Sequence, residues 1–200
     1  ASLRYDGASQ LADGHKWASF PSLALAWRIE QEEFMSNLKV ISNLKLRLGY
    51  GVTGNAAIDA YDTKGALMSN YYNWSTVNSS LGYVSSDPSA RNPVPMANQD
   101  LSWERTSQYN LGIDFGVLNS RISGSIDIYK TRTEDLLMLK TIPSLTGYTY
   151  TWDNVGVTEG SGIDLQINTV NIKNENFIWT TNISWSKDKS EIVELVNGNT

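Results

Sequence analysis

Residues 44–52, LKLRLGYGV, alternate between apolar and non-apolar side chains at every step. Leucine, tyrosine and valine fill the even positions, and Lys45, Arg47 and two glycines fill the odd positions. Neighbouring side chains of a β-strand point to opposite faces, so this period of two predicts a strand with one apolar and one non-apolar face.

The end of the same stretch, GYGVTG at residues 49–54, has the G-x-G-x-x-G spacing of a dinucleotide-binding turn. The strand before such a turn is buried on both faces and reads as a continuous apolar run. Two cationic side chains interrupt the run here, so the nucleotide-binding interpretation fails. We expect Gly49 and Gly51 to lie on the non-apolar face, and Gly54 to lie in the turn after the strand.

The same alternation recurs along the chain, and no long segment has a helical period. These segments predict an all-β protein, an antiparallel meander of about seven strands. The predicted strands are residues 2–6, 23–29, 44–52, 109–117, 122–128, 163–168 and 177–186.

Composition excludes several classes of protein. The formal net charge of -5 comes without a basic stripe, so nucleic acid is not an expected partner. The chain has no cysteine, which rules out disulfides and thiol chemistry. No run approaches the ~18 apolar residues of a spanning helix, but a transmembrane strand needs only ~9–11 residues with every second one apolar.

The connections between the predicted strands are short or long in alternation. Links at 118–120 and 171–176 are short and polar, whereas two long loops run from about 53 to 101 and from about 136 to 153. This pattern is typical of a large outer-membrane β-barrel with long extracellular loops. A soluble antiparallel β-sandwich that binds carbohydrate is the alternative, because it shows the same alternation.

Two features of the side chains favour the membrane barrel. The non-apolar face is rich in Gly, Ser, Asn and Asp, which suits a wet lumen. Aromatic residues gather at the strand ends, as in an interfacial girdle; they are Trp17, Phe20, Trp103, Tyr109, Tyr129, Trp152, Phe177 and Trp185. The barrel predicts that one set of residues faces lipid, and the sandwich would bury the same set in a dry core; the set is Leu46, Leu48, Ile113, Phe115, Ile126 and Leu165.

Four runs, in the right order and spacing, resemble the C-terminal barrel region of the SusC/RagA-type TonB-linked outer-membrane proteins. They are RYDGASQLADGHKWASFPSLALAWRIEQEEF (4–34), NLKLRLGYGVTGN (43–55), NQDLSWERTSQYNLGIDFGVLNSRISGSIDIYKTRTEDLL (98–137) and TGYTYTWDNVGVTEGSGIDLQI (146–167). The resemblance covers most of the chain outside the loop at 56–97.

This resemblance implies energy-coupled import of a nutrient, a glycan or peptide, across the bacterial outer membrane. It implies a partner lid lipoprotein of the SusD type outside the barrel and an inner-membrane TonB complex that acts through a plug. The family's plug domain and TonB box have no counterpart in these residues. Residues 1–200 are therefore expected to form part of a barrel of roughly twenty-two strands.

No set of residues converges on catalysis or on a metal or cofactor, so we expect a protein that is not an enzyme. His15 is the single histidine and falls in a predicted outer turn, which excludes histidine clusters. The adjacent pair Glu134 and Asp135 would point to opposite faces of a strand, so it does not form a glycosidase pair. Asp59 and Asp62 are candidate Ca²⁺ ligands, but they lack the spacing of an EF-hand, so we expect no calcium site there. The acidic run at 30–33 is expected to be a solvated link.

The first long loop carries a cluster of aromatic residues that is unusual for a linker. Tyr71, Tyr72, Trp74 and Tyr83 are candidates for stacking on sugar rings or peptide side chains, or for contact with the lid lipoprotein. Packing against one another, which would hold the loop down, is the alternative role.

Overall fold

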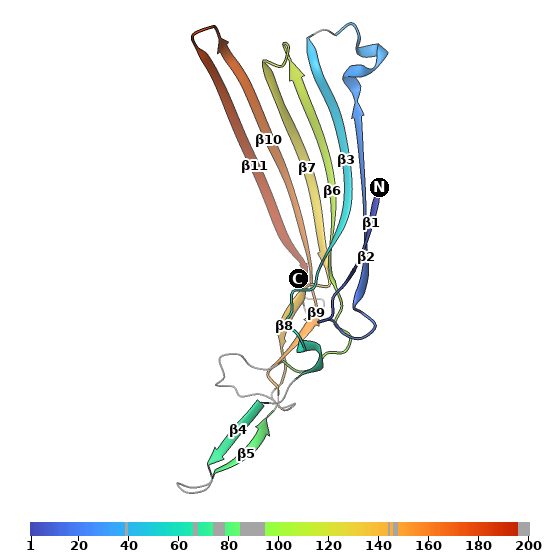
Figure 1. Cartoon of the computed structure of the whole chain (residues 1–200), viewed down its shortest axis with the longest axis vertical. Helices are drawn as coiled ribbons and strands as arrows, with labels where there is room; N and C mark the ends of the chain where they lie inside the picture. Colours follow the sequence, from blue (N-terminus) through green and yellow to red (C-terminus); the bar gives the residue numbers. More distant parts are fainter. Residues whose placement is uncertain are drawn as a thin grey trace.

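The computed structural model of the chain describes residues 1–38, 40–65, 68–73, 79–84, 95–143, 145 and 148–195, with the backbone alone for 68–73 and 79–84. Its main element is a seven-stranded antiparallel sheet in the order β1-β2-β3-β6-β7-β10-β11 (Figure 1). Each strand of the sheet pairs with the next one along the chain, which makes a meander. The strands are β1 (Ser2–Gly7), β2 (Trp17–Arg28), β3 (Ile41–Asn55), β6 (Glu104–Val117), β7 (Ile122–Glu134), β10 (Val157–Lys173) and β11 (Ile178–Glu194).

The seven predicted strands are therefore confirmed, although most of them are longer than the alternation indicated. Their extra length lies mainly on the side of the long loops, where polar residues continue the main-chain pairing. Gly54 shows the consequence: it lies inside β3, opposite Arg105, and the expected turn begins only after Asn55. The prediction for Gly54 was wrong because polar residues extend a strand without leaving an apolar pattern.

All short links lie at one end of the sheet and all long loops at the other (Figure 1). The link after β2 contains two short 3-10 turns, η1 (Ile29–Gln31) and η2 (Glu33–Met35). The long loops contain a third 3-10 turn and two separate hairpins: η3 (Asp62–Lys64), β4 (Met68–Asn73) with β5 (Ser79–Val84), and β8 (Leu137–Thr141) with β9 (Tyr150–Asn154). No helix in the described part of the chain is both long and apolar enough to span a membrane.

Fully buried apolar residues are few in the described part of the chain, and all except Phe20 on β2 belong to loops at the long-loop end. Leu11 and Leu101 are 1% and 0% exposed, and they belong to loops at the long-loop end. By contrast, the sheet leaves Leu25 58% exposed and Ile128 47% exposed. A soluble sandwich would bury such residues between two layers, so the sandwich alternative is not favoured.

Residues 1–200 expressed alone in buffer should aggregate, because β1 and β11 are unpaired edges and one face of the sheet is apolar. Light scattering after size-exclusion chromatography would measure this. The same chain in detergent should stay dispersed. A monodisperse monomer with a cooperative thermal transition in buffer alone would contradict the prediction.

Candidate membrane-facing wall and loop platform

The apolar side chains form continuous rows across the outer face of the sheet. Leu46, Ile113, Ile126 and Leu165 are successive register partners on β3, β6, β7 and β10. Leu48 and Phe115 lie in the two adjoining rows. The set predicted to face lipid thus shares one face, and nothing in the described residues covers it: Leu48, Ile113 and Ile126 are 47%, 39% and 37% exposed.

The edge of this apolar band slants across the strands on the long-loop side. Val52 pairs with Ser107, so on β6 the band already ends one row earlier, at Tyr109. Tyr109 in turn pairs with Lys130. The continuous apolar band on the outer face ends at Val52 on β3, Tyr109 on β6, Ile128 on β7, Ile163 on β10 and Trp185 on β11.

The slant measures how the strands are tilted against a flat apolar layer. The edge moves by about six residues over the four steps from β3 to β11, which at a rise of ~3.3 Å and a strand spacing of ~4.8 Å corresponds to about 45°. Strands of transmembrane barrels are tilted by ~35–45°. The band therefore has the outline that a bilayer would impose on the wall of a barrel.

Two tryptophans show the slant directly. Trp27 pairs with Leu46 and Trp185 pairs with Leu165, so both tryptophans belong to the same row. Trp27 lies at the short-link edge of the band, where its indole Nε1 donates a hydrogen bond to Glu32 Oε1 at 2.8 Å. Trp185 lies at the opposite edge, since Lys187 follows it on the outer face. Amphipathic indole rings are favoured at both boundaries of a membrane.

The aromatic girdle expected from the strand ends is only partly present. Of the eight residues in that prediction, Trp17, Tyr109, Phe177 and Trp185 are exposed. The other four have different positions: Phe20 is 3% exposed and packs edge-on against Trp103 at 5.3 Å, Tyr129 bonds to Asp188 on the polar face, and Trp152 donates to Asp62. A position near a strand end does not reveal which face the side chain takes or which loop packs on it.

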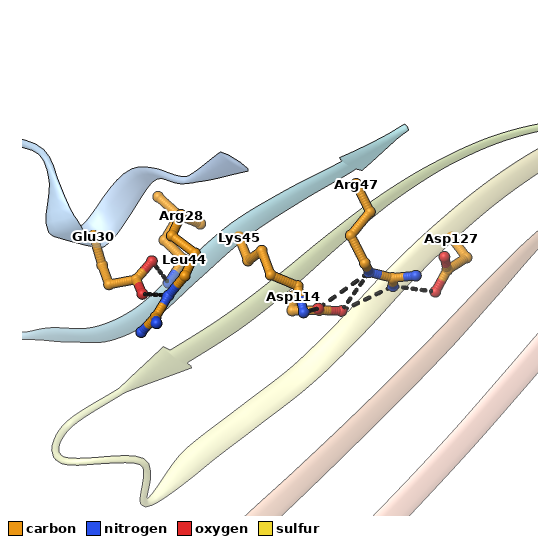
Figure 2. A network of polar contacts seen from close by, with 7 residues as sticks. All are labelled: Arg28, Glu30, Leu44, Lys45, Arg47, Asp114 and Asp127. Carbon is orange, nitrogen blue, oxygen red and sulfur yellow. Dashed lines mark hydrogen bonds and ion pairs between the residues drawn. The ribbon is translucent and has the colours of Figure 1, made fainter. Parts of the chain in front are cut away.

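The inner face carries a linked group of charges on three neighbouring strands (Figure 2). Arg47 on β3 contacts Asp114 on β6 at 2.8 Å and Asp127 on β7 at 3.0 Å, both through Nη2. Lys45 Nζ contacts the same Asp114 at 3.0 Å. These four side chains are about a fifth to a third exposed, and each charge has an opposite partner, so the group ties the strands together and leaves no charge unpaired.

Gly112 makes the contact between Arg47 and Asp127 possible, which reaches across the middle strand. It lies between Arg47 and Asp127 in the register, on the middle strand of the three. A Cβ atom at Gly112 would lie 2.5 Å from Asp127 Oδ1 and 2.7 Å from Arg47 Nη2. The arginine therefore crosses the middle strand through the space that the glycine leaves.

A second glycine repeats this arrangement two strands away. Gly162 on β10 lies between Tyr129 on β7 and Asp188 on β11, and the tyrosine hydroxyl donates a hydrogen bond to the aspartate. A Cβ at Gly162 would lie 2.5 Å from both the phenol oxygen and Asp188 Oδ1. Neither crossing was predicted from the sequence; the signal for one is a glycine at an inward position of a strand, between polar residues on the flanking strands.

Gly49 and Gly51 behave differently and leave open space. They lie on the polar face as expected, and Cβ atoms there would have nearest neighbours at 3.7 Å and 3.8 Å. They line a groove of about 280 Å³ together with Ser22, Gln108 and Asn110. This groove hollows the wall beside the glycine-rich stretch.

The acidic link after β2 is less solvated than expected. The Glu30 side chain is 11% exposed, and its carboxylate accepts hydrogen bonds from Arg28 Nε at 2.8 Å and from the Leu44 N–H at 3.3 Å (Figure 2). Partial desolvation opposes ionisation, but these hydrogen bonds outweigh it and hold the pKa of Glu30 below its ordinary value. Glu30 thus ties the link to Leu44 on β3, and the prediction of a solvated link was wrong for Glu30.

At the other end, the connections after β1, β3 and β7 pack together into a unit that we call the loop platform. Its core contains Ala8, Leu11 and Ala56 from the connections after β1 and β3, with Ile58 and Trp103 against it, and Leu101, also in the connection after β3, is fully buried. Main-chain bonds join the pieces, including Ala12 N to Leu101 O at 3.3 Å.

The second long loop is locked to the first by polar contacts. Trp152 Nε1 donates to Asp62 Oδ2 at 2.7 Å, and the Asn154 side chain exchanges hydrogen bonds with the main chain of Ser102 at 2.7 and 3.0 Å. Met96 also forms a bridge with Thr151. The loops at this end therefore form one interlocked unit.

The residues considered for catalysis or metal binding are scattered. His15 is exposed, and Asp62 is engaged by Trp152 while Asp59 is exposed. Glu134 pairs with Arg132, whereas Asp135 lies beyond β7 with a φ of 56°, so the prediction that these two are neighbours on a strand was wrong. Among the described residues, no group of three or more His, Cys, Asp or Glu is placed to hold a metal.

The aromatic cluster of the first long loop falls on the β4–β5 hairpin, at the far end from the short links (Figure 1). Tyr71 and Tyr72 belong to β4 and Tyr83 to β5, with Tyr71 opposite Leu81 and Tyr83 opposite Ser69. Trp74 lies outside the described residues. Their contact with a ligand or lid stays a prediction.

A sheet with one slanted apolar face, one polar face and loops at a single end defines the chain as part of the wall of a membrane-type β-barrel. A family model described as TonB dependent receptor-like, beta-barrel, matches residues 1–200. The chain belongs to this family of TonB-dependent receptors.

Relatives and solved structures agree with this assignment. The chain is 37% identical over 202 residues to the TonB-dependent receptor SusC of Bacteroides thetaiotaomicron, covering 98% of this chain and 19% of SusC. It is 36% identical over 197 residues to the TonB-dependent receptor P39 of Formosa agariphila, covering 98% and 18%. The solved structure of the RagAB peptide transporter matches with a TM-score of 0.80 and 26% identity, over 98% of this chain and 20% of that one. The chain thus spans about a fifth of its relatives' length, and the SusC/RagA resemblance is confirmed.

The Gly112 crossing can be tested by adding one methyl group. Gly112→Ala in the full-length protein should lower its stability by about 1–3 kcal/mol, because the methyl group displaces the Arg47 bridge between β3 and β7. The thermal transition in detergent would measure the loss. Gly49→Ala is the matched control, since its Cβ meets only ordinary contacts. Equal losses in the two variants would contradict the role of the crossing.

Proposed function

We propose that residues 1–200 form part of the barrel wall and outer loops of an energy-dependent nutrient importer in the bacterial outer membrane. The observation that carries the proposal is the slanted apolar band, with its exposed leucines and isoleucines, opposite a face of glycine and small polar residues. Family membership supports it. In this role the chain is a transport segment and not an enzyme.

The wall provides a rigid, wet inner surface. The charges of Lys45, Arg47, Asp114 and Asp127 neutralise one another, so this region does not hold a cargo through a net charge. The groove at Gly49 and Gly51 leaves space on the inner face, which suits contact with a plug. The plug and the TonB box, through which the inner-membrane TonB complex would act, belong to other parts of the protein. Residues 1–200 contribute the wall and its loops, including the long loops at about 53–101 and 136–153.

The cargo is a glycan or a peptide. The name of one solved match, the RagAB peptide transporter, supports a peptide, and the glycan rests on the SusC/RagA resemblance. The loop platform offers a fixed base for a lid lipoprotein of the SusD type, because its loops interlock through Trp152, Asn154 and Leu101. Tyr71, Tyr72, Trp74 and Tyr83 are the proposed contacts with cargo or lid.

A charge placed in the middle of the apolar band tests the membrane placement. Ile126→Arg in the full-length protein should reduce assembly, because a charge at the bilayer midplane costs ~2–4 kcal/mol on the lipid face of a barrel. The fraction of protein with heat-modifiable migration in outer-membrane extracts would measure assembly.

Ser161→Arg is the matched control, because Ser161 lies on the same face but beyond the edge of the band on β10. There the cost falls to ~0–1 kcal/mol. Full assembly of Ile126→Arg would overturn the proposal that this face meets lipid.

The role of the loop aromatics requires a separate test. A variant with alanine in place of all four residues, Tyr71, Tyr72, Trp74 and Tyr83, should bind cargo or lid lipoprotein at least tenfold more weakly. The reason is that each buried aromatic contact contributes strongly to an interface. Affinity of the purified variant for the lid lipoprotein and for candidate glycans and peptides would be measured by calorimetry. Unchanged affinity for all of them, with normal assembly, would restrict these residues to packing within the loop.

A further inference from the structure

Four cations border the apolar band on the side of the long loops, and we call them the cationic rim: Lys130, Arg132, Lys187 and Lys189. On β11, Lys187 is the first outward residue after Trp185. On β7, Lys130 is the first outward residue after Ile128. The rim therefore follows the slanted edge of the band from strand to strand.

The register brings the rim cations of two different strands into one row. Ser161 on β10 pairs with Lys130 on one side and with Lys189 on the other. The two lysines therefore lie on the strands that flank β10, with only the small side chain of Ser161 between them in the row. Their side chains are well exposed, 60% for Lys130 and 71% for Lys189.

Carboxylates accompany the rim, but they lie one or two rows further from the band. Glu159 pairs with Lys130 at 2.8 Å and with Arg132 at 2.7 Å, and Glu134 pairs with Arg132 at 2.7 Å. Glu191 pairs with Lys189. Lys187 has no ion-pair partner among the described residues. An anion that approaches along the apolar band therefore meets cations first and carboxylates only beyond them.

An apolar groove of about 580 Å³ lies directly beside the rim. Leu48, Leu111 and Ile128 line it on the side of the band. Tyr50, Tyr109 and Lys130 line it on the side of the loops, and the two tyrosine rings are 4.8 Å apart. The lining of the groove thus changes, from the band toward the loops, from aliphatic side chains to phenol and ammonium groups within one row of residues.

We propose that the groove and the cationic rim bind a phosphate-bearing lipid of the loop-side leaflet, with its acyl chain in the groove and its phosphate on Lys130 and Lys189. The inference rests on the proposed function, since it requires the apolar face to meet a bilayer. A phosphate offers several strong acceptor oxygens to lysine ammonium groups, and basic residues beside a membrane attract anionic headgroups. The groove is continuous with the rim, which favours a lipid over a free anion, because a free anion would make no contact with the apolar wall of the groove.

Binding of phosphorylated lipid A to the full-length protein in detergent micelles tests this site. Replacing both Lys130 and Lys189 with serine should weaken binding about tenfold or more, as measured by native mass spectrometry across a lipid titration. Dephosphorylated lipid A should bind wild type and variant alike. The control Lys64→Ser with Lys140→Ser removes the same charge from the loop end, away from the apolar face, and should leave binding unchanged.

The possible failures are distinguishable. If the wild type does not assemble into the outer membrane, as judged by heat-modifiable migration, the proposed function fails. If it assembles and the rim variant binds phosphorylated lipid A as tightly as the control does, the lipid site is overturned while the proposed function stands. Equal wild-type affinity for the phosphorylated and dephosphorylated forms also overturns it.

Discussion

The antiparallel hydrogen-bond ladder from β1 to β11 is the interaction on which everything else in the chain depends. It pairs each strand with the next strand of the sheet and sets the register of all seven, with local irregularities in the β3–β6 and β10–β11 pairs. In a bilayer the main chain has no water to bond with, so only such a ladder, closed into a barrel, satisfies it. The ladder also sorts the side chains: one face collects the leucines and isoleucines, and the other collects glycine, serine and paired charges.

Tilt connects the ladder to the membrane. Since the strands cross the apolar layer at an angle, a row of register partners runs from one boundary of the layer to the other, as Trp27 and Trp185 show. The same tilt places Lys187 on β11 in the row of Ile163 and Ile128, where the middle of the sheet is still apolar. Lys187 interrupts this apolar row, but because of the tilt it lies at the boundary of the apolar layer.

Glycine has two roles on the inner face: it leaves open space, or it lets a side chain from one flanking strand reach the other. The sequence does not show which glycine has which role. The faces of Gly49 and Gly51 followed from alternation, and the structure confirms them. The crossings at Gly112 and Gly162 depend on side chains from strands on both sides, which are far apart in the sequence, so a pattern within one strand does not contain them. Phe20 was misplaced for a related reason: its partner Trp103 comes from a distant loop.

By itself, the sequence determined the strand content, the meander, the separation of apolar and polar faces and the family, because a period of two is a local property and the family motifs are continuous runs. It also determined which links are short and which are long. The tertiary structure alone decided the slant of the apolar band, the tie between Glu30 and β3, the interlocking of the loops and the position of the cationic rim beside its groove. These features arise from register and packing between segments distant in the chain, and no local pattern encodes how far one strand is shifted against the next.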